Sequence, residues 1–336
     1  MSFQLYPKES IFIAGSYGMV GSAIKKELTK EGFYNSSEIL TPTKKELDLT
    51  DFQAVNKWFK TNKPTIVIIA AAKVGGILAN SKFPYDFILQ NLKIQTNLIE
   101  ISFLNNVKKL LFLGSSCIYP KFSKQPIRED YLMTDSLEKT NEFYAIAKIA
   151  GIKLCQSLMI QNKFNAICLM PTNLYGPRDN YHPKNSHVIP SLIRKFHEAK
   201  IFNQKNVTCW GTGSPLREFL YVQDLAKACL FLLKNWNPIS DIKKQTANKE
   251  ENICWINVGS QYEISIKELA EKISDICGFE GKILWDNSKP DGTPRKKLDI
   301  TNINSLGWFP EISLDKGLKL TLDAYIKEKR SNELRS

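Results

Sequence analysis

The sequence predicts an α/β protein with a doubly wound parallel sheet and a smaller α/β lobe. Short apolar runs alternate with longer stretches that could form crossover helices, which is the order expected of a parallel sheet. The first apolar run ends in regularly spaced glycines. After about residue 176 the sequence becomes rich in turn-forming residues around short elements, which is typical of a separate, smaller lobe.

The predicted elements follow one another along the chain in a strand, helix, strand order. The apolar runs expected to be strands are residues 10–14, 39–40, 66–71, 110–113 and 166–170. The helical patterns are residues 19–31, 83–105, 141–161 and 264–277. A polar stretch at residues 235–252 lacks an apolar period and is expected to be a surface loop, and residues 330–336 are expected to be a frayed tail.

The composition is that of an ordinary soluble protein, with 43% hydrophobic and 24% charged residues. No apolar run approaches the roughly 18 residues that cross a bilayer, and the polar start has no signal-peptide pattern, so no membrane partner is expected. The seven cysteines are scattered and form no Cys-x-x-Cys pair, which favours reduced thiols in the cytoplasm over disulfides or a metal site.

The net charge of +12 suggests an anionic partner, because a positive field concentrates phosphates around a cleft. The lysines are dispersed along the chain and do not form a stripe, so a nucleic acid is not expected. A generally basic surface without a special partner is the alternative interpretation.

A glycine-rich turn joins the first strand to the first helix with the spacing G-x-x-G-x-x-G. Such a turn lets the backbone approach a pyrophosphate closely, and the helix N-terminus adds N–H groups and partial positive charge. In this position it indicates a Rossmann sheet that binds a dinucleotide, although a merely tight turn would look the same in isolation. The residues of the predicted cofactor turn are Gly15, Ser16, Tyr17, Gly18, Met19, Val20 and Gly21.

The residues after the second strand indicate which dinucleotide is bound. An acid there accepts the 2′-hydroxyl of NAD, whereas basic groups accept the 2′-phosphate of NADP. Residues 40–46 place no acid at the strand end but include Lys44 and Lys45, which favours NADP (NADPH). The two lysines could equally be a solvated helix start, and Asp48 could face the adenine or cap the next helix.

A Tyr-x-x-x-Lys pattern places Tyr144 and Lys148 on one face of a predicted helix. A cation beside a phenol lowers the pKa of the phenol and makes it a usable proton donor near neutral pH. Spacing alone would suit two surface residues as well. Ser115, however, follows a strand at the sheet edge where ligands of open α/β sheets bind. The glycine turn, this serine and the Tyr/Lys pair together form the signature of the short-chain dehydrogenase/reductase superfamily.

Longer strings within this signature closely resemble the GDP-L-fucose synthases, an extended branch of that superfamily. The resemblance runs from Ile11 to about Ala324. It implies a two-step reaction, in which C3 and C5 of GDP-4-keto-6-deoxy-D-mannose are epimerised and the C4 ketone is then reduced by NADPH. The strings that carry it are Ala70–Ile77, Gly114–Pro120, Tyr144–Gly151, Met170–Pro177 and Asn185–Pro190.

The resemblance also implies roles for single residues. Cys117 matches the epimerisation base, which would need a positive neighbour such as protonated His187 or the cofactor to become a thiolate. His187 matches the acid, Tyr144 the proton donor in reduction, Lys148 the group that lowers its pKa and binds the ribose, and Ser115 the hydroxyl that orients the carbonyl. Without the resemblance, Cys117 would be read as a core thiol and His187 as a loop histidine.

Further matches would surround the cofactor and the sugar nucleotide. Matching the cofactor site are Leu113, Gly114, Ser115, Ser116, Lys148, His187 and the loop of Pro171, Thr172, Asn173 and Leu174. Matching the GDP-sugar site are Lys195, Trp210, Arg217 and Asp291, of which Trp210 could otherwise be a core aromatic. A homodimer through the two long helices is the family-level expectation.

The resemblance divides the chain and leaves some alternatives open. Residues 1–176 would bind NADP together with a return segment at about 220–258, and residues 177–219 and 259–330 would form the substrate-binding lobe. The family often carries an arginine where this chain has Tyr17 and another near Pro42, which leaves Lys44 or Lys45 to read the 2′-phosphate. Rival functions are another nucleotide-sugar reductase, a 4-epimerase, and a dinucleotide sensor without catalysis.

Overall fold

The computed structural model describes residues 9–33, 38–241 and 253–335, and it confirms the predicted fold class. Six parallel strands form the central sheet in the order β2-β1-β3-β4-β5-β9. The order reverses at β1, and ligands of such sheets bind at the carboxyl ends of the strands near this point. The strands are β1 (Ile11–Ala14), β2 (Ile39–Leu40), β3 (Ile66–Ile69), β4 (Lys109–Leu113), β5 (Ala166–Pro171) and β9 (Trp255–Val258).

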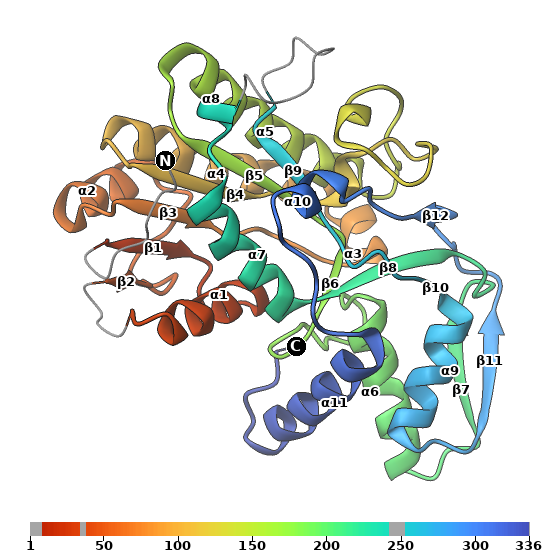
Figure 1. Cartoon of the computed structure of the whole chain (residues 1–336). Helices are drawn as coiled ribbons and strands as arrows, with labels where there is room; N and C mark the ends of the chain where they lie inside the picture. Colours follow the sequence, from red (N-terminus) through yellow and green to blue (C-terminus); the bar gives the residue numbers. More distant parts are fainter. Residues whose placement is uncertain (1–8, 34–37, 242–252, 336) are drawn as a thin grey trace.

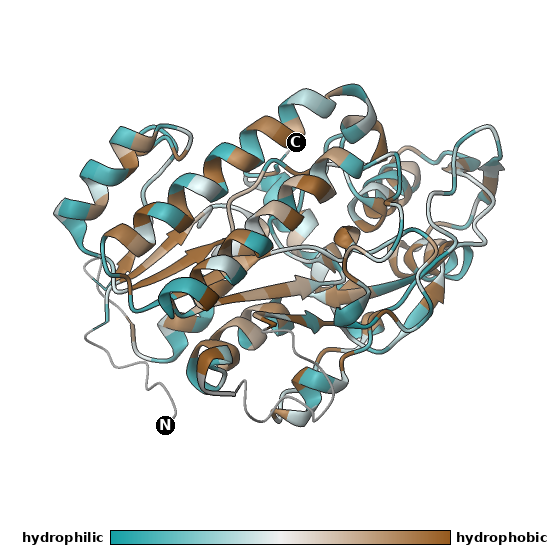
Figure 2. Ribbon diagram, turned by 90° about the horizontal axis from the view of Figure 1, so that it is seen from above, coloured by the Kyte–Doolittle hydropathy of each residue, from teal (hydrophilic) through white to brown (hydrophobic). Residues whose placement is uncertain are grey.

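Helices cover both faces of this sheet, as Figure 1 shows. On one face α1 (Met19–Lys30) packs against α7 (Val222–Asn235), and on the other α4 (Pro84–Leu104) packs against α5 (Glu142–Asn162). The strands are buried along their length and consist almost wholly of apolar residues, which appear in Figure 2 as brown arrows between the helices. Burial on both faces explains why these strands read as continuous apolar runs without alternation.

A second, smaller hydrophobic core forms the interior of the lobe, which is built mainly from three helices and two small sheets. Strand β8 (Leu216–Tyr221) pairs with β6 (Asn173–Tyr175), β10 (Glu263–Ser265) and β12 (Arg295–Lys296), while β7 (Asn206–Trp210) pairs with β11 (Lys282–Asp286). The lobe helices are α6 (Val188–Ile201), α9 (Ile266–Cys277) and α11 (Leu314–Arg330).

Two segments differ from the expected division. Leu298, Ile300, Ile303 and Trp308 lie in the span assigned to the lobe, but they pack in the core of the central sheet because α10 (Thr301–Ser305) lies against β9. Of the stretch expected to be a loop at 235–252, residues 242–252 lie outside the described residues. Before them, Trp236 is buried and Pro238–Asp241 form the short helix α8.

Candidate active site

One cavity of about 910 Å³ lies where the carboxyl ends of the sheet strands face the lobe. It brings together nearly every residue that the sequence singled out. Leu113 and Lys148 are exceptions, since both are buried behind the cavity wall, and Lys45 does not line the cavity either. The predicted residues that line it are Gly15, Ser16, Tyr17, Gly18, Met19, Val20, Gly21, Lys44, Gly114, Ser115, Ser116, Cys117, Tyr144, Pro171, Thr172, Asn173, Leu174, His187, Lys195, Trp210, Arg217 and Asp291.

The glycine turn has the shape of a diphosphate cradle. Gly15 has a φ of +84°, and a Cβ placed on it would lie 2.8 Å from the backbone of Ala71. A Cβ on Gly21 would lie 2.2 Å from the carbonyl oxygen of Gly15, so the helix could not start this close to the strand. Gly18 is the N-cap of α1, and Ser16 Oγ, in a residue only 5% exposed, has no hydrogen-bond partner among the described residues. The turn therefore fits a dinucleotide diphosphate.

The segment after β2 also reaches the cavity. Of the two lysines considered for the 2′-phosphate, Lys44 lines the cavity and Lys45 does not. Asp48 lines the cavity as well, and its Oδ1 accepts hydrogen bonds from Thr50 N and Oγ1. The N-cap of α2 (Phe52–Asn62) is Asp51, so Asp48 does not cap this helix.

Ser115, Cys117 and Tyr144 form one cluster at the end of β4. Ser115 caps a single 3₁₀ turn, and its Oγ accepts a hydrogen bond from Cys117 N at 3.2 Å. Burial raises the pKa of the Tyr144 phenol above its ordinary range, the neighbouring Cys117 raises it further, and a hydrogen bond with Ser115 lowers it. The arrangement places a hydroxyl, a thiol and a phenol against the same volume.

Lys148 lies one turn along α5 from Tyr144 but is only 3% exposed. Its Nζ lies 5.9 Å from the centre of the Tyr144 ring and donates to the carbonyl oxygen of Leu113 at 2.8 Å. Burial lowers the pKa of Lys148 to about 7. That its charge lowers the pKa of Tyr144 stays a prediction, since burial dominates the pKa values of both groups.

Cys117 has a cationic partner that the sequence did not indicate. Lys296 Nζ lies 3.2 Å from Cys117 Sγ and donates a hydrogen bond to it. Burial raises the pKa of Cys117, but Lys296, Ser115 and Arg217 outweigh burial, and the pKa lies below that of an ordinary thiol. Lys296 therefore supplies the positive neighbour that a Cys117 thiolate needs, in place of protonated His187 or the cofactor.

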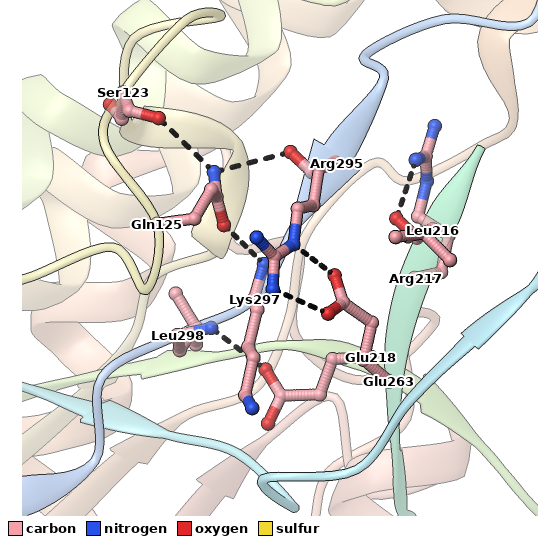
Figure 3. A network of polar contacts seen from close by, with 9 residues as sticks. All are labelled: Ser123, Gln125, Leu216, Arg217, Glu218, Glu263, Arg295, Lys297 and Leu298. Carbon is pink, nitrogen blue, oxygen red and sulfur yellow. Dashed lines mark hydrogen bonds and ion pairs between the residues drawn. The ribbon is translucent and has the colours of Figure 1, made fainter.

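The strand that carries Lys296 is fixed on both sides, as Figure 3 shows for its neighbours. Arg295 forms two 2.8 Å hydrogen bonds to the carboxylate of Glu263, and Lys297 N donates to Gln125 Oε1 at 2.9 Å. Lys296 pairs in register with Arg217 of β8, so both cations come from neighbouring positions of one small sheet. Only the tertiary fold brings Lys296 to Cys117, since 179 positions separate them.

His187 lies at the N-cap of α6 and lines the same cavity. Desolvation by the surrounding protein lowers the pKa of the imidazole, and Lys296 lowers it further. A neutral imidazole is therefore favoured at neutral pH, and the proton on His187 depends on the charge near Lys296.

The lobe side of the cavity presents an aromatic ring and several polar groups. Trp210 is 50% exposed, so it is not a core aromatic, and Lys195 Nζ lies 5.7 Å from the centre of its ring. Arg217 Nη2 donates to the backbone oxygen of Asp291 at 3.3 Å. The carboxylate of Asp291 accepts from Thr212 N and Oγ1, which fixes the loop beside the cavity.

Together the doubly wound sheet, the glycine cradle and the Ser115/Tyr144 pair define an oxidoreductase that uses a nicotinamide cofactor. Comparison with known proteins agrees. The model of the NAD dependent epimerase/dehydratase family matches residues 11–242. GDP-L-fucose synthase 1 of Arabidopsis thaliana is 55% identical over 317 residues, which are 94% of this chain and 93% of that protein.

Two solved structures share the whole architecture. A GDP-6-OMe-4-keto-L-xylo-heptose reductase from C. jejuni is 38% identical with a TM-score of 0.89, and the match covers 98% of this chain and 100% of the other. A GDP-L-fucose synthetase from Naegleria fowleri, bound to NADP, is 26% identical with a TM-score of 0.85 and coverages of 100% and 98%. The chain belongs to the NAD-dependent epimerase/dehydratase family and, within it, to the GDP-L-fucose synthases.

Proposed function

We propose that the protein makes GDP-L-fucose from GDP-4-keto-6-deoxy-D-mannose by epimerising C3 and C5 and then reducing the C4 ketone with NADPH. The observation that carries this proposal is the contact between Cys117 and Lys296 in the same cavity as Ser115 and Tyr144. One cavity then holds a base for epimerisation and a proton donor for reduction.

In the epimerisation, Cys117 acts as the base. Protons next to a ketone are acidic because the charge left behind spreads onto the carbonyl oxygen. Lys296 and Arg217 favour the thiolate form of Cys117 that removes such a proton. His187, whose neutral form is favoured at neutral pH, takes up a proton before it returns one to the carbon, and the hydroxyls of Ser115 and Tyr144 hydrogen-bond to the ketone oxygen while charge gathers on it.

In the reduction, Tyr144 donates a proton to the C4 oxygen, and Ser115 holds that oxygen in place. The nicotinamide cofactor, when bound, supplies the hydride. Lys148 lies behind Tyr144 with its Nζ donating to the backbone oxygen of Leu113, and we expect its charge to lower the pKa of the phenol. The residues of the glycine turn would hold the cofactor diphosphate, and Pro171–Leu174 would lie beside the nicotinamide.

The choice of NADP over NAD is part of the proposal. Lys44 is a described cation at the cavity wall after β2, and the related Naegleria fowleri structure binds NADP. Lys44→Met should lower the ratio of kcat/KM for NADPH to kcat/KM for NADH by about tenfold, since one charge-assisted hydrogen bond is lost. Lys45→Met is the matched control. An unchanged ratio in Lys44→Met would remove Lys44 from this role.

The GDP moiety fits the lobe side of the cavity. The exposed face of Trp210 can stack on a purine, and the guanidinium of Arg217 offers a fork of donors to a diphosphate. Lys195 adds positive charge beside the ring. Together with the net charge of +12, these groups favour a doubly charged sugar nucleotide as substrate.

The similarity to a reductase in C. jejuni makes a reductase without epimerisation the competing function. Such an enzyme needs Ser115 and Tyr144 but no base with a lowered pKa. A 4-epimerase likewise needs no second base, because it would oxidise and reduce the same carbon. The Lys296 contact to Cys117 favours the epimerase-reductase over both.

The deciding experiment supplies GDP-4-keto-6-deoxy-D-mannose to the purified protein with NADPH in D₂O. We expect NADPH oxidation, GDP-L-fucose as the product, and deuterium at C3 and C5. Cys117→Ala should lose the deuterium incorporation while still binding NADPH. No turnover at any substrate concentration would overturn the assignment, and full deuterium incorporation by Cys117→Ala would remove Cys117 as the base.

We also propose that the protein forms a homodimer through α4 and α5. Its location is proposed to be the cytoplasm, where its seven free thiols would stay reduced. Among the described residues, α5 alone is long and apolar enough to cross a membrane. Its inner face, however, carries Tyr144 and Lys148 against the sheet.

A second copy of the protein is the better cover for the exposed apolar side chains of α4 and α5. Ile160→Glu should therefore yield a monomer, as measured by light scattering. The exposed residues are Tyr85, Leu104, Phe143, Ile146 and Ile160.

A further inference from the structure

The segment after α11, expected to be a frayed tail, is anchored in the described structure. Leu334 packs against the lobe core, and the backbone oxygen of Arg335 accepts a hydrogen bond from Tyr181 N at 2.8 Å. Tyr181 itself is buried and its ring lies 4.6 Å from that of Tyr325. In Figure 1 the chain turns back after α11 toward the middle of the molecule. Residue 335 therefore has a defined position.

That position puts the side chain of Arg335 at the glycine turn. A Cβ placed on Gly18 would lie 3.7 Å from Arg335 Nη1, and Arg335 lines the same cavity as residues 15–21. Nη1 donates to the backbone oxygen of Arg178 at 3.3 Å. A guanidinium has five N–H donors, so this bond positions the group and leaves donors for a ligand.

A buried aspartate lies near this guanidinium. Asp179 is 3% exposed and lines the cavity, and its Oδ1 accepts from Asn180 N at 2.7 Å. Burial raises the pKa of Asp179 to about 7, and the charge of Arg335 acts in the opposite direction. The preceding residue, Arg178, is held by a 2.9 Å hydrogen bond from its N to Glu328 Oε1 of α11. The loop after β6 and the segment after α11 therefore fix each other beside the turn.

The turn presents its own donors at the same place. Gly18 begins α1, whose first N–H groups have no partner within the helix, and the buried hydroxyl of Ser16 has none among the described residues. A helix N-terminus, a buried hydroxyl and a positioned guanidinium converge on one part of the cavity. Their shared ligand chemistry is a phosphate group.

We propose that Arg335 binds the diphosphate of the dinucleotide cofactor and so closes the glycine turn from the lobe side. This inference rests on the proposed function only in requiring that a dinucleotide binds at this turn. Because α11 and Arg335 belong to the lobe, the contact would also tie the lobe to the sheet when the cofactor is bound. Arg335 would therefore contact a group that NADPH and NADH share. Lys44, in contrast, lies after β2, where the 2′-phosphate found only in NADPH is bound.

The test measures dissociation constants of NADPH and NADH by calorimetry, without sugar nucleotide. We expect Arg335→Ala to weaken both by about tenfold and by the same factor, and Arg335→Lys to keep part of the affinity. Arg330→Ala is the matched control, since it removes an equal charge from the exposed last turn of α11 and should leave both constants unchanged. Lys44→Met should weaken NADPH alone.

Two results would overturn the proposal. Unchanged constants in a folded Arg335→Ala, checked by an unchanged Tm, would show that Arg335 is no ligand. Loss of affinity for NADPH alone would assign Arg335 to the 2′-phosphate instead of the diphosphate. The proposed sugar-nucleotide activity is tested separately, because wild-type protein that binds NADPH but turns over no substrate would contradict that activity and leave these binding results standing.

Discussion

A buried lysine lies at each end of strand β4, and the two lysines differ in the number of hydrogen-bond acceptors that their ammonium groups contact. Lys109 is the first residue of β4 and is 0% exposed, and its Nζ donates to the backbone oxygens of Leu232, Leu233 and Trp236. At the other end, Lys148 of α5 donates to the backbone oxygen of Leu113, the last residue of β4. Both ammonium groups lie out of contact with bulk water.

The difference separates a structural lysine from a functional one. Lys109 meets three carbonyls at the end of α7, which satisfies its three donors and places a cation at the negative end of the helix. Lys148 has one carbonyl among the described residues and lies beside the cavity wall, where burial lowers its pKa. Burial of a lysine is therefore no sign of function by itself, and the number of acceptors is the better indicator.

The largest expected effect is a loss of catalytic rate on substitution of Lys148, at the cavity end of β4. Lys148→Met should lower kcat for NADPH-dependent ketone reduction by roughly 10² to 10⁴, because Tyr144 loses its neighbouring cation. Stability should fall little or rise, since a desolvated charge is removed. Steady-state kinetics and urea unfolding measure the two quantities. Lys153→Met is the control, because Lys153 is an exposed lysine on the same helix whose Nζ donates to Gln156 Oε1. A loss of less than tenfold would make Lys148 a structural lysine like Lys109.

The next largest effect is expected for Lys296, the cation that contacts Cys117 at the same edge of the sheet. Lys296→Met should raise the pKa of Cys117 and slow solvent deuterium incorporation at neutral pH by roughly tenfold or more, with partial recovery as the pH rises. Lys297→Met is matched to it, because the backbone N of Lys297 makes the bond to Gln125 and its side chain is not needed for it. Equal rates in the two variants would show that Lys296 does not promote the thiolate.

At the opposite end of β4 the effect should fall on stability alone. Lys109→Met should lower the free energy of unfolding by about 2–3 kcal/mol, because three buried carbonyls at the end of α7 lose their donor. The kcat should stay within about twofold of the wild type. Lys272→Met, which breaks an exposed ion pair with Asp315, is the control and should cost at most about 1 kcal/mol. A large loss of activity with little change in stability would reverse the roles assigned to the two lysines.

Which parts of the site the sequence could predict depends on how far apart along the chain the cooperating residues lie. The glycine turn and the Tyr144/Lys148 pair are local patterns, so the strand, the turn and the shared helix face followed from spacing. Lys296 and Arg335 reach the cavity through tertiary packing, and neither lies in a motif. Lys109 reads as an ordinary polar residue before an apolar run, and the three carbonyls that explain its burial lie more than 120 positions away.

The smallest effect, counted over one pH unit, is a pH dependence of stability that should distinguish Lys148. Its pKa is about 7 in the folded protein and 10.5 ordinarily, so below about pH 7 the lysine is protonated in both states and its burial destabilises the fold fully. Above pH 7 the unfolded chain binds the extra proton, and stability rises with pH by at most about 1.4 kcal/mol per pH unit until about pH 10. Urea unfolding of wild type and Lys148→Met over this range isolates the contribution, because other titrating groups cancel in the difference. The wild type should gain stability relative to the variant as the pH rises. A difference that falls instead would mean that the ammonium at this end of β4 is as well satisfied as the one on Lys109.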